Sequence, residues 1–448
     1  MKVQVNPSIF RDYDIRGIYP AEVNERSYYI IARALAQYLK VSEIAVGRDC
    51  RTSSNKLHEA FVNGLVDSGV NVVDLGLIST EIHNFASGKY RFDANVIISA
   101  SHNPPEYNGL KILTSGVVAI HGDRGLPQIR KLALAQKFSK VKAKGKIRKL
   151  SILNDWIDHA LTFVNAKKLK MLKVVVDVGN GMGGMSWSEI AKKLPIDIIP
   201  LYFEPDGRFP NHLPDPLNHN NLRDLISKIK EEKADLGFAI DGDADRLFVL
   251  DEEGCAISGT ITSAIISDYL LQKFGPSTIL YNAVCGKIVP NVISKSGGTP
   301  IRVRVGHSFI KEAMKKNKAL FAGEHSGHFY FKENYYADSS LIAGLILIQL
   351  LSENNKPFSQ IVAEFDKYFS SGEINFKTED VSKVLKESEE HFSGAISIDH
   401  LDGLSVWYND WWFNMRASKT EPLLRLNLEA DTKVLLRDKI KEVSDIIL

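Results

Sequence analysis

The chain has 448 residues, of which 44% are hydrophobic and 25% charged, values that are ordinary for a globular protein of about three to four domains. Its formal net charge of +2 gives no electrostatic basis for binding nucleic acid. Three scattered cysteines argue against a disulfide framework, and the sequence has no apolar signal core and no apolar run long enough for a bilayer, so a cytoplasmic location away from membranes is expected.

The beginning of the chain alternates between predicted helices and strands. Apolar spacing predicts helices over 25–40 and 57–68, and short apolar runs predict strands over 43–46 and 70–75. This alternation favours a parallel sheet with helical crossovers. Ahead of it, Arg16 precedes a glycine on a tight turn, where its guanidinium suits an oxyanion or, equally, a salt bridge to a nearby aspartate.

The stretch from Ile98 to Lys111 is the first candidate for chemistry. An apolar run delivers Ser101 into a turn that Pro104 and Pro105 prevent from continuing as a strand. Open α/β sheets bind their ligands at such carboxyl ends of strands. The Ser101 hydroxyl can meet a ligand there, with Lys111 as a cation for an anionic oxygen. The alternative is an ordinary Ser/Asn/Pro surface loop.

A basic, polar stretch over 136–149 indicates the end of the first domain. The second begins with a predicted helix over 153–164 and a buried strand over 173–178, followed by the glycine-rich segment 179–184. This segment formally matches the dinucleotide-binding GxGxxG spacing, with Glu204 at the position of the expected acid. A lone match of this kind is weak, so a tight strand-to-helix turn is favoured.

A predicted helix over 222–230 and strand over 234–240 lead to three alternating carboxylates, those of Asp241, Asp243 and Asp245. Carboxylates at this spacing around a glycine can converge on one hard cation. An EF-hand calcium loop is a rival because Glu252 falls at its twelfth position, but Arg246 replaces the glycine required at the sixth. A magnesium site at a strand end is therefore favoured over calcium, with an acidic surface turn as the remaining alternative.

A third domain is predicted from Asp251 to the mid-360s, with a helix over 257–272, a strand over 278–283 and a buried helix over 338–351. Its glycine-bounded loop 323–328 offers an acceptor, a hydroxyl and histidine donors suited to sugar hydroxyls. Two of these side chains, His325 and His328, could instead bind zinc, although no third ligand with zinc spacing is near them in the sequence.

The last segment differs in character from the others. Partial alternation over 395–406 and a predicted strand over 423–428 indicate an α+β domain with an antiparallel sheet. The loop between the strands of this domain carries four donors suited to a phosphate dianion, those of Arg416, Ser418, Lys419 and Thr420. A generic polar hairpin loop is the alternative.

Taken together, five of these segments resemble the α-D-phosphohexomutase family over the whole chain, closest to its phosphomannomutase/phosphoglucomutase branch. They are residues 10–17, 99–105, 241–246, 323–328 and 416–422. Their order and separations are more specific than any single motif. The resemblance implies three similar α/β domains with mixed, mainly parallel sheets and a C-terminal α+β domain around a central cleft. The domain boundaries expected are 1–148, 149–250, 251–366 and 367–448.

The resemblance implies a phosphohexomutase that interconverts the 1- and 6-phosphates of mannose, glucose or both. Ser101 would carry a phosphoryl group and, together with Asp241, Asp243 and Asp245, would hold Mg²⁺. A hexose 1,6-bisphosphate would be the intermediate and activator. The implied partner is a small phosphosugar, and the implied protein is a monomer or weak dimer.

The resemblance also assigns roles to individual side chains. Those implied to act in catalysis besides Ser101 are Lys111, Arg16, Arg246 and His307. Those implied to bind substrate are Tyr13, Glu324, Ser326, His328, Arg416, Ser418, Lys419, Thr420 and Arg425. Two departures from the family pattern stand out. Lys419 replaces a small or amide residue, and a basic residue found near Val284 in relatives is missing, for which Lys287 could substitute.

Three other functions remain open at this point. A phosphoglucosamine mutase would share the chemistry, although residues 13–16 and 324–326 favour the mannose/glucose branch. A metal-dependent phosphatase would use Ser101 as the nucleophile and water as the final acceptor. A calcium-binding or scaffold protein would bind metal without turnover.

Overall fold

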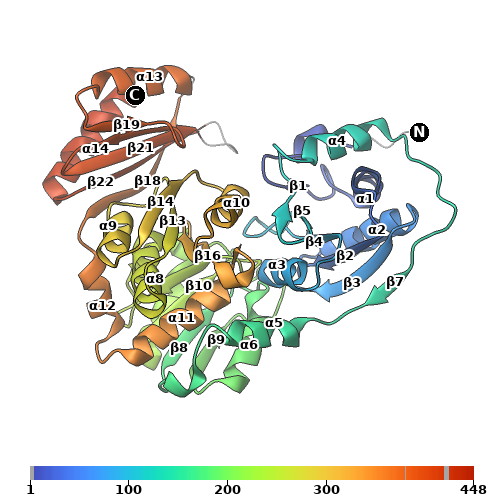
Figure 1. The fold of residues 1–448 in the computed structure, drawn as a ribbon, viewed down its shortest axis with the longest axis horizontal. Coiled ribbons are helices and arrows are strands. Elements are labelled where there is room, and N and C mark those ends of the chain that lie inside the picture. The colour runs from blue at the N-terminus through green and yellow to red at the C-terminus, as the bar shows by residue number, and fades with distance from the viewer. Residues whose placement is uncertain (1–4, 379, 418–422) are drawn as a thin grey trace. The chain divides into compact units, whose positions relative to one another are not determined.

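A computed structural model describes residues 5–378, 380–417 and 423–448. The chain forms two compact units, one of Met1–Ser258 and Ser326–Ser359 and the other of Gly259–His325 and Gln360–Leu448. The predicted fold class is confirmed, because three α/β/α domains with mixed sheets are followed by a C-terminal domain built on an antiparallel sheet (Figure 1).

The first unit begins with a seven-stranded sheet in the order β1-β5-β4-β2-β3-β7, with β6 beside β5. Strands β2, β3, β4 and β7 are parallel, and β1, β5 and β6 pair antiparallel. The strands are β1 (Ile15–Ile18), β2 (Glu43–Arg48), β3 (Asn71–Leu77), β4 (Ala94–Ile98), β5 (Tyr107–Thr114), β6 (Val118–Ala119) and β7 (Ile147–Lys149). The helices are α1 (Glu25–Leu39), α2 (Ser54–Val66), α3 (Thr80–Lys89) and α4 (Leu126–Ala135).

Helices cover both faces of this first sheet. Side chains of α1, α2 and α4 share one apolar core with one sheet face, whereas α3 packs against β4 from outside that core. Strand β4 is buried at every residue, as a central strand covered on both faces should be. Helix α3 begins at an N-cap, Ser79, whose hydroxyl accepts a hydrogen bond from the Ile82 N–H. This cap places Thr80 at the first position of the helix.

The same unit contains a five-stranded sheet in the order β12-β11-β10-β8-β9. Its strands are β8 (Lys173–Asp177), β9 (Asp197–Leu201), β10 (Leu236–Ile240), β11 (Leu247–Leu250) and β12 (Ala256–Ile257). Its helices are α5 (Leu153–Leu161), α6 (Gly183–Lys193) and α7 (Arg223–Glu232). Strands β8, β9 and β10 are parallel, and β10 and β11 form the antiparallel pair that flanks the predicted metal loop. The glycine-rich segment after β8 is the predicted strand-to-helix turn.

The later part of the first unit holds an antiparallel hairpin and one buried helix. These are β16 (Phe329–Phe331), β17 (Ala337–Asp338) and α11 (Ser340–Glu353). Helix α11 is buried from Ser340 to Ser352, in agreement with the apolar pattern of the sequence. Short 3₁₀ helices are η1 (Pro7–Ile9), η2 (Ala166–Lys168), η3 (His219–Leu222) and η4 (Lys332–Asn334).

The second unit contains the parallel strands β13 (Thr278–Asn282), β14 (Thr299–Val303) and β15 (Phe321–Gly323). The helices around them in sequence are α8 (Gly259–Phe274), α9 (Ile288–Lys295) and α10 (His307–Asn317), and α12 (Phe358–Phe365) contains the passage from the first unit to the second. Strand β13 lies between the other two, so β13 and β15 present their carboxyl ends at the same edge.

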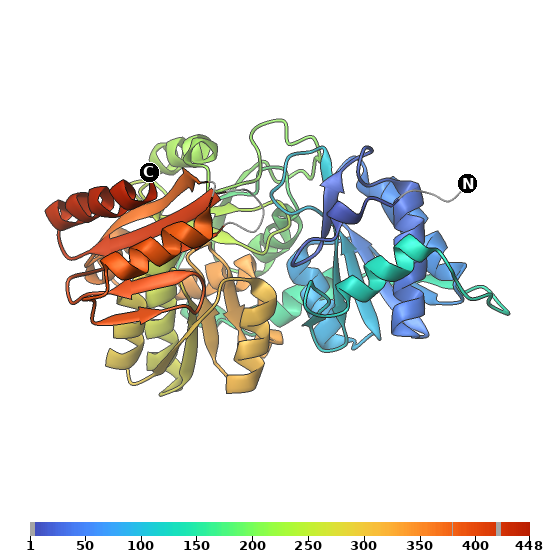
Figure 2. The ribbon, with the colours of Figure 1, turned by 90° about the horizontal axis from the view of Figure 1, so that it is seen from above.

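The C-terminal sheet is antiparallel, in the order β18-β22-β21-β20-β19. Its elements are β18 (Phe369–Lys377), α13 (Val381–His391), β19 (Ser397–Asp399), β20 (Leu404–Trp407), β21 (Trp411–Ala417), β22 (Leu423–Ala430) and α14 (Lys433–Ile447). Figure 2 shows α13 and α14 lying along this sheet, and both contribute to its apolar core.

The structure adds one strand in a stretch that sequence reasoning treated as a polar domain end. Strand β7 is exposed at all three residues, yet it pairs in parallel with β3 from Val72 to Asp74. An edge strand of this kind is held by backbone hydrogen bonds rather than by burial, so hydrophobic periodicity cannot detect it.

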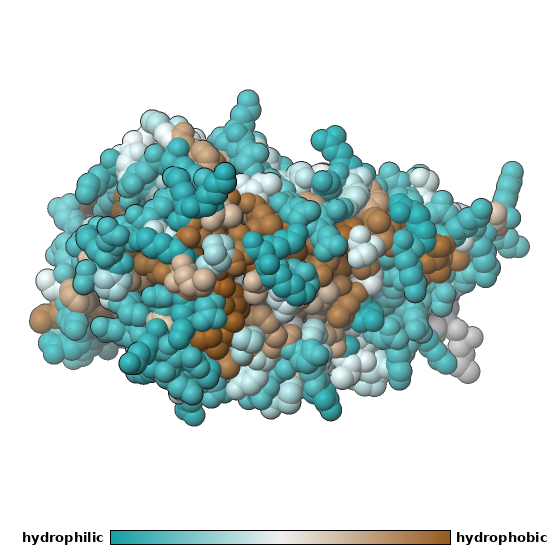
Figure 3. All heavy atoms as spheres, turned by 90° about the horizontal axis from the view of Figure 1, so that it is seen from below, coloured by the Kyte–Doolittle hydropathy of each residue, from teal (hydrophilic) through white to brown (hydrophobic). Residues whose placement is uncertain are grey.

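The described helices give no membrane span. Across residues 5–378, 380–417 and 423–448, every helix is too short or too polar to cross a lipid bilayer. Figure 3 shows hydrophilic residues over much of the face it displays, with apolar residues visible between them.

Candidate active site

Ser101 lies just beyond β4, in an unusual backbone conformation. Its φ of 52° falls in the left-handed region, which few residues other than glycine adopt. The turn is closed by the Asn103 N–H, which donates to the Ala100 carbonyl oxygen at 3.1 Å, and the Ser101 N–H donates to Ser99 Oγ at the same distance. Residues held in such conformations concentrate at functional sites.

The Ser101 hydroxyl meets the predicted metal loop. Its Oγ donates to Asp241 Oδ2 at 3.1 Å and lies 3.2 Å from His102 Nδ1. Asp241 directly follows β10, so the carboxyl ends of β4 and β10, from two different sheets of the first unit, contribute to one site. The structure thus brings together two segments that the sequence singled out separately.

Three buried carboxylates form the centre of this site. Asp241, Asp243 and Asp245 each offer an oxygen, and these oxygens all lie within 4.8 Å of one another. Asp243 Oδ1 and Asp245 Oδ1 are buried without a hydrogen-bond partner, which leaves them available as ligands. Burial, and then the charges of Asp245 and Asp243, raise the pKa of Asp241 far above its usual range. Hard oxygen donors and crowded negative charge fit a divalent cation such as Mg²⁺.

Lys111 enters the site from β5. Its Nζ lies 2.6 Å from Asp243 Oδ2 and 2.9 Å from Asp245 Oδ2. Burial opposes the charged form of Lys111, but the two carboxylates outweigh it and raise its pKa, so the side chain is an ammonium at neutral pH. Thr80, which sequence reasoning missed, accepts from Lys111 Nζ at 3.3 Å and donates its own hydroxyl to Asp243.

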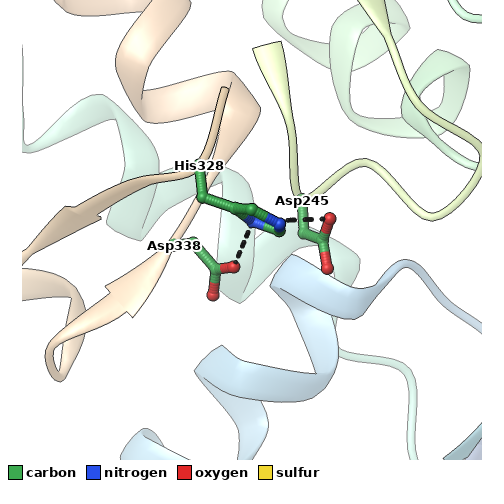
Figure 4. Close-up of side chains that lie close together, drawn as sticks. All are labelled: Asp245, His328 and Asp338. Carbon is green, nitrogen blue, oxygen red and sulfur yellow. Dashed lines mark hydrogen bonds and ion pairs between the residues drawn. The ribbon is translucent and has the colours of Figure 1, made fainter. Parts of the chain in front are cut away.

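Arg246 and His328 complete the surroundings of the carboxylates. Arg246 Nε lies 3.7 Å from Asp241 Oδ2, and a single β-bridge joins Arg246 to His328. Figure 4 shows His328 between two carboxylates, with Nδ1 2.8 Å from Asp338 Oδ2 and 3.7 Å from Asp245 Oδ1. Burial favours the neutral ring, but Asp245 and Asp338 outweigh it and raise the pKa of His328.

The zinc alternative looks different once the chain is folded. Asp245, His328 and Asp338 form a second group whose ligand atoms lie within 4.8 Å of one another. Of the two histidines considered as zinc ligands, only His328 belongs to this group, so the described residues do not bring the predicted pair together around one site. His325 has a different environment, since its Nδ1 lies 2.9 Å from Thr260 Oγ1 in the second unit.

Arg16 forms the salt bridge to a nearby aspartate that was one of the two roles considered for it. Its Nη2 forms the salt bridge with Asp14, at 2.5 Å, while its Nη1 donates to Asn103 Oδ1 on the Ser101 turn. Tyr13 is half-buried two residues before β1. Arg16 therefore lies against the turn that carries the candidate nucleophile.

The other predicted residues are spread over the second unit and the start of the Ser326–Ser359 segment. Glu324 is buried and accepts a hydrogen bond from Asn282 Nδ2 at 3.1 Å, Ser326 is half-buried, and His307 is the first residue of α10. Lys287 Nζ donates to the Asn409 carbonyl oxygen at 2.7 Å, which gives the direction of a side chain that the sequence left unassigned.

Arg416 and Arg425 lie directly opposite each other on β21 and β22. Both contact Glu373 of β18, at 3.1 Å for Arg416 Nη2 and 3.3 Å for Arg425 Nη1. The Glu373 carboxylate thus offsets the repulsion between two like charges at opposed positions. The remaining predicted members of the phosphate loop, Ser418, Lys419 and Thr420, lie outside the described residues.

The EF-hand alternative does not agree with the structure. Strands β10 and β11, rather than helices, flank the Asp241 loop. Glu252 accepts hydrogen bonds from the Ser359 hydroxyl and N–H, at 2.5 and 3.1 Å, and does not join the carboxylate cluster.

Gly242 is required where the metal loop meets the Ser101 turn. A Cβ at this position would lie 2.6 Å from the Ser101 carbonyl oxygen and 3.0 Å from Pro214 Cγ. We expect Gly242→Ala to lower the free energy of unfolding by about 1–3 kcal/mol, because the two loops must move apart. Gly394→Ala is the control, since no atom lies within 4 Å of the added Cβ there. If urea titrations give Gly242→Ala and Gly394→Ala the same midpoint, the two loops are not in close contact at Gly242.

Comparisons with known proteins cover almost the whole chain. Four family models match it, described as phosphoglucomutase/phosphomannomutase alpha/beta/alpha domain I (residues 7–139), domain II (154–254), domain III (258–368) and C-terminal domain (373–446). A phosphomannomutase of Vibrio cholerae is 37% identical over 98% of both chains, and one of Methanocaldococcus jannaschii is 38% identical over 98% of this chain and 97% of its own. The crystal structure of a phosphoglucomutase/phosphomannomutase family protein from Burkholderia thailandensis superposes with a TM-score of 0.89 at 30% identity, covering 98% of this chain and 97% of that one.

Proposed function

Because the chain belongs to the phosphoglucomutase/phosphomannomutase family of α-D-phosphohexomutases, we propose that it interconverts the 1- and 6-phosphates of mannose and glucose through a phosphorylated Ser101. The family makes the protein a phosphohexose mutase; the choice of sugars and the chemical route are the proposal. The observation that carries it is the Ser101 hydroxyl, 3.1 Å from Asp241 in a buried carboxylate cluster that also holds the Lys111 ammonium.

The proposed reaction consists of two phosphoryl transfers, each between Ser101 Oγ and a sugar oxygen. In the first, the bond from phosphorus to Ser101 Oγ breaks as a bond forms to the free hydroxyl of a hexose monophosphate. That hydroxyl loses a proton, Ser101 Oγ gains one, and the product is a hexose 1,6-bisphosphate. In the second, the bisphosphate has turned round, Ser101 Oγ loses its proton and takes the other phosphoryl group, and the released sugar oxygen gains a proton. The enzyme ends phosphorylated, as it began.

The cationic side chains would stabilise charge on the phosphoryl group during transfer. Phosphoryl transfer depends mainly on positioning and on preorganised positive charge. Lys111 is fixed by two carboxylates, and Arg246 lies beside Asp241, so neither must reorganise when a phosphoryl group arrives. Arg16 would contribute from the other side of the Ser101 turn, through its bond to Asn103.

The residues that would hold Mg²⁺ are Asp241, Asp243 and Asp245 with an oxygen of phosphorylated Ser101. When bound, the ion polarises the phosphoryl group and offsets its negative charge. The buried Oδ1 atoms of Asp243 and Asp245, which accept no hydrogen bond, support this assignment.

Two further groups of residues would hold the sugar phosphate. Glu324 and Ser326 would bind sugar hydroxyls, with His307 and His328 as additional contacts. The phosphate that is not reacting would be held by Arg416, Ser418, Lys419 and Thr420, and Arg425 and Tyr13 would be further substrate contacts. The opposed guanidinium groups of Arg416 and Arg425 support a phosphate site, because a dianion can accept two donors from each.

Coupled assays with three substrates test the proposed function. Mannose 1-phosphate, glucose 1-phosphate and glucosamine 1-phosphate are each supplied with Mg²⁺ and a trace of the matching bisphosphate. We expect 6-phosphates of mannose and glucose as the main products. Inorganic phosphate as the main product would indicate a phosphatase instead, and turnover of glucosamine 1-phosphate alone would reassign the substrate.

The reorientation of the bisphosphate makes a prediction about sugar choice. Glu324 and Ser326 must find hydroxyls that lie similarly in both poses, and glucose and mannose differ only at C2. We expect kcat/KM for the two sugars to agree within about one to two powers of ten. A small difference in substrate structure that the site does not contact is worth about 1–3 kcal/mol. Glu324→Gln should lower both values by a similar factor, whereas Glu333→Gln, an exposed carboxylate, should change neither. Loss of one sugar alone would mean that Glu324 distinguishes the C2 hydroxyl.

A further inference from the structure

Arg51 is buried under the Ser101 turn and donates to the backbone of that turn. Its Nη2 donates to the carbonyl oxygens of Ser101 at 2.7 Å and Asn103 at 2.5 Å. Its Nη1 donates to those of Pro104 at 2.6 Å and Tyr107 at 3.1 Å. One guanidinium therefore holds four carbonyl groups within seven residues.

The backbone hydrogen bonds within the Ser101 turn leave several of its carbonyl groups to other donors: the Asn103 N–H donates to Ala100 and the Tyr107 N–H to Pro104, both at 3.1 Å. Pro104 and Pro105 lack an N–H, and the left-handed Ser101 departs from the pairing of β4. Buried carbonyl groups without a donor are costly, so the turn requires donors from outside. A planar guanidinium with a fixed fork of N–H groups can serve four acceptors at once, whereas an ammonium offers three donors.

Arg51 is itself held from two sides. Its Nε lies 3.3 Å from Asp49 Oδ2, and Asp49 also accepts from the Arg51 N–H at 3.0 Å. On the other side, the guanidinium carbon lies 5.1 Å from the centre of the Phe209 ring, and a Cβ on Gly207 would lie 2.3 Å from Arg51 Cα. The loop that carries Gly207 and Phe209 follows β9 in the neighbouring domain, so this domain covers Arg51 within the first unit.

We infer that Arg51 is a positioning residue that holds Ser101 in the left-handed conformation from which its Oγ faces Asp241. Arg51 does not touch the reacting atoms, and it acts through the carbonyl group of Ser101 and those of three residues that follow it. Its effect on turnover rests on the proposed function, but its effect on the order of the turn does not.

The experiment combines hydrogen exchange with kinetics on the full chain. Arg51→Lys keeps the positive charge but loses the planar guanidinium with its fixed N–H groups, and Arg51→Ala removes both. Arg208→Met removes an exposed arginine from the covering loop and is the control. Thermal melting first identifies variants that remain folded. We expect faster amide exchange over residues 99–110 in both Arg51 variants and unchanged exchange in Arg208→Met.

Kinetics distinguish positioning from simple packing. In Arg51→Lys, kcat should fall about 100-fold with KM changed less than about threefold, because a nucleophile displaced by about 1 Å loses roughly that factor while binding persists. Millimolar guanidinium should raise the activity of Arg51→Ala about tenfold, since it can occupy the vacated site.

Two results would overturn the inference. One is unchanged exchange over 99–110 in Arg51→Lys with kcat within threefold of the wild type; the other is a rise in KM that accounts for the whole loss. If Arg51→Ala unfolds, Arg51→Lys alone decides by the same criteria. A wild-type protein that fails to isomerise any hexose phosphate would refute the proposed function, and the exchange measurement would still decide the role of Arg51.

Discussion

Ser101→Ala is expected to lower turnover of hexose phosphates by about four powers of ten or more while leaving the protein folded. The hydroxyl is the only group in the variant that disappears, and it is the proposed donor and acceptor of the phosphoryl group in both transfers. Its loss removes the covalent route rather than weakening one contact, so no neighbouring side chain can compensate.

The fold should tolerate this change because the backbone of the turn does not depend on the hydroxyl. The Ser101 N–H is bonded to Ser99 and its carbonyl group to Arg51, and alanine keeps both bonds. Asp241 loses one donor but keeps the N–H groups of Asp245 and Arg246, at 3.1 and 3.2 Å from Oδ1. The thermal midpoint should therefore stay close to that of the wild type.

Intact-mass and phosphopeptide measurements test the same assignment without relying on turnover. Wild-type protein incubated with a hexose bisphosphate should gain one phosphate that maps to Ser101, and Ser101→Ala should gain none. Ser115→Ala, which removes an exposed hydroxyl from a turn after β5, is the matched control and should be labelled like the wild type. Phosphate found on another residue, with full activity in Ser101→Ala, would refute the nucleophile.

Local sequence patterns predicted the two loops that the structure brings together at the candidate site. The apolar run before Ser101 and the prolines after it predicted a strand end, and β4 ends three residues earlier. The alternating carboxylates of 241–245 likewise predicted a cluster, and the structure brings their oxygens together. In both cases a local pattern was enough, because side chains two residues apart on one turn are close in any fold.

Residues recruited over long distances could not be found in this way. Thr80 reaches Asp243 because α3 begins beside the metal loop, and Asp338 reaches His328 because of the β16–β17 hairpin. In the sequence, nothing distinguishes Arg51 from other arginines in loops. Only the fold places four carbonyl groups around its guanidinium. No spacing in the sequence relates these residues to their partners, so only the topology of the sheets could reveal them.

The balance of charge at the site leads to the second large effect. If all three carboxylates are ionised beside the two fixed cations, Lys111 and Arg246, one negative charge is in surplus, and the raised pKa of Asp241 shows that burial and its neighbours make this surplus unfavourable. A bound divalent cation would make the net charge of these groups positive. A phosphoryl group on Ser101 would then be attracted to the site. The site is therefore expected to need metal for turnover and to gain stability when metal binds.

Removal of divalent cations with EDTA should stop turnover, and excess Mg²⁺ should restore it. Asp243→Asn keeps the shape of the side chain but removes one of the charges, so it should lower kcat by about 100-fold or more, the loss expected when preorganised electrostatic stabilisation is removed. Asp438→Asn, an exposed carboxylate on α14, makes the same chemical change away from the site and should leave kcat unaltered.

A thermal shift tests metal binding separately from catalysis. Mg²⁺ at about 100 times its dissociation constant should stabilise the wild type by about 2.7 kcal/mol, because the folded state alone presents the clustered carboxylates. The shift should be smaller in Asp243→Asn, where one charged ligand is lost, and undiminished in Asp438→Asn. If Asp243→Asn keeps both full activity and the full Mg²⁺ shift, the cluster of Asp241, Asp243 and Asp245 does not hold the catalytic metal, and the stabilising charge at Ser101 must come from the cationic side chains Lys111, Arg246 and Arg16.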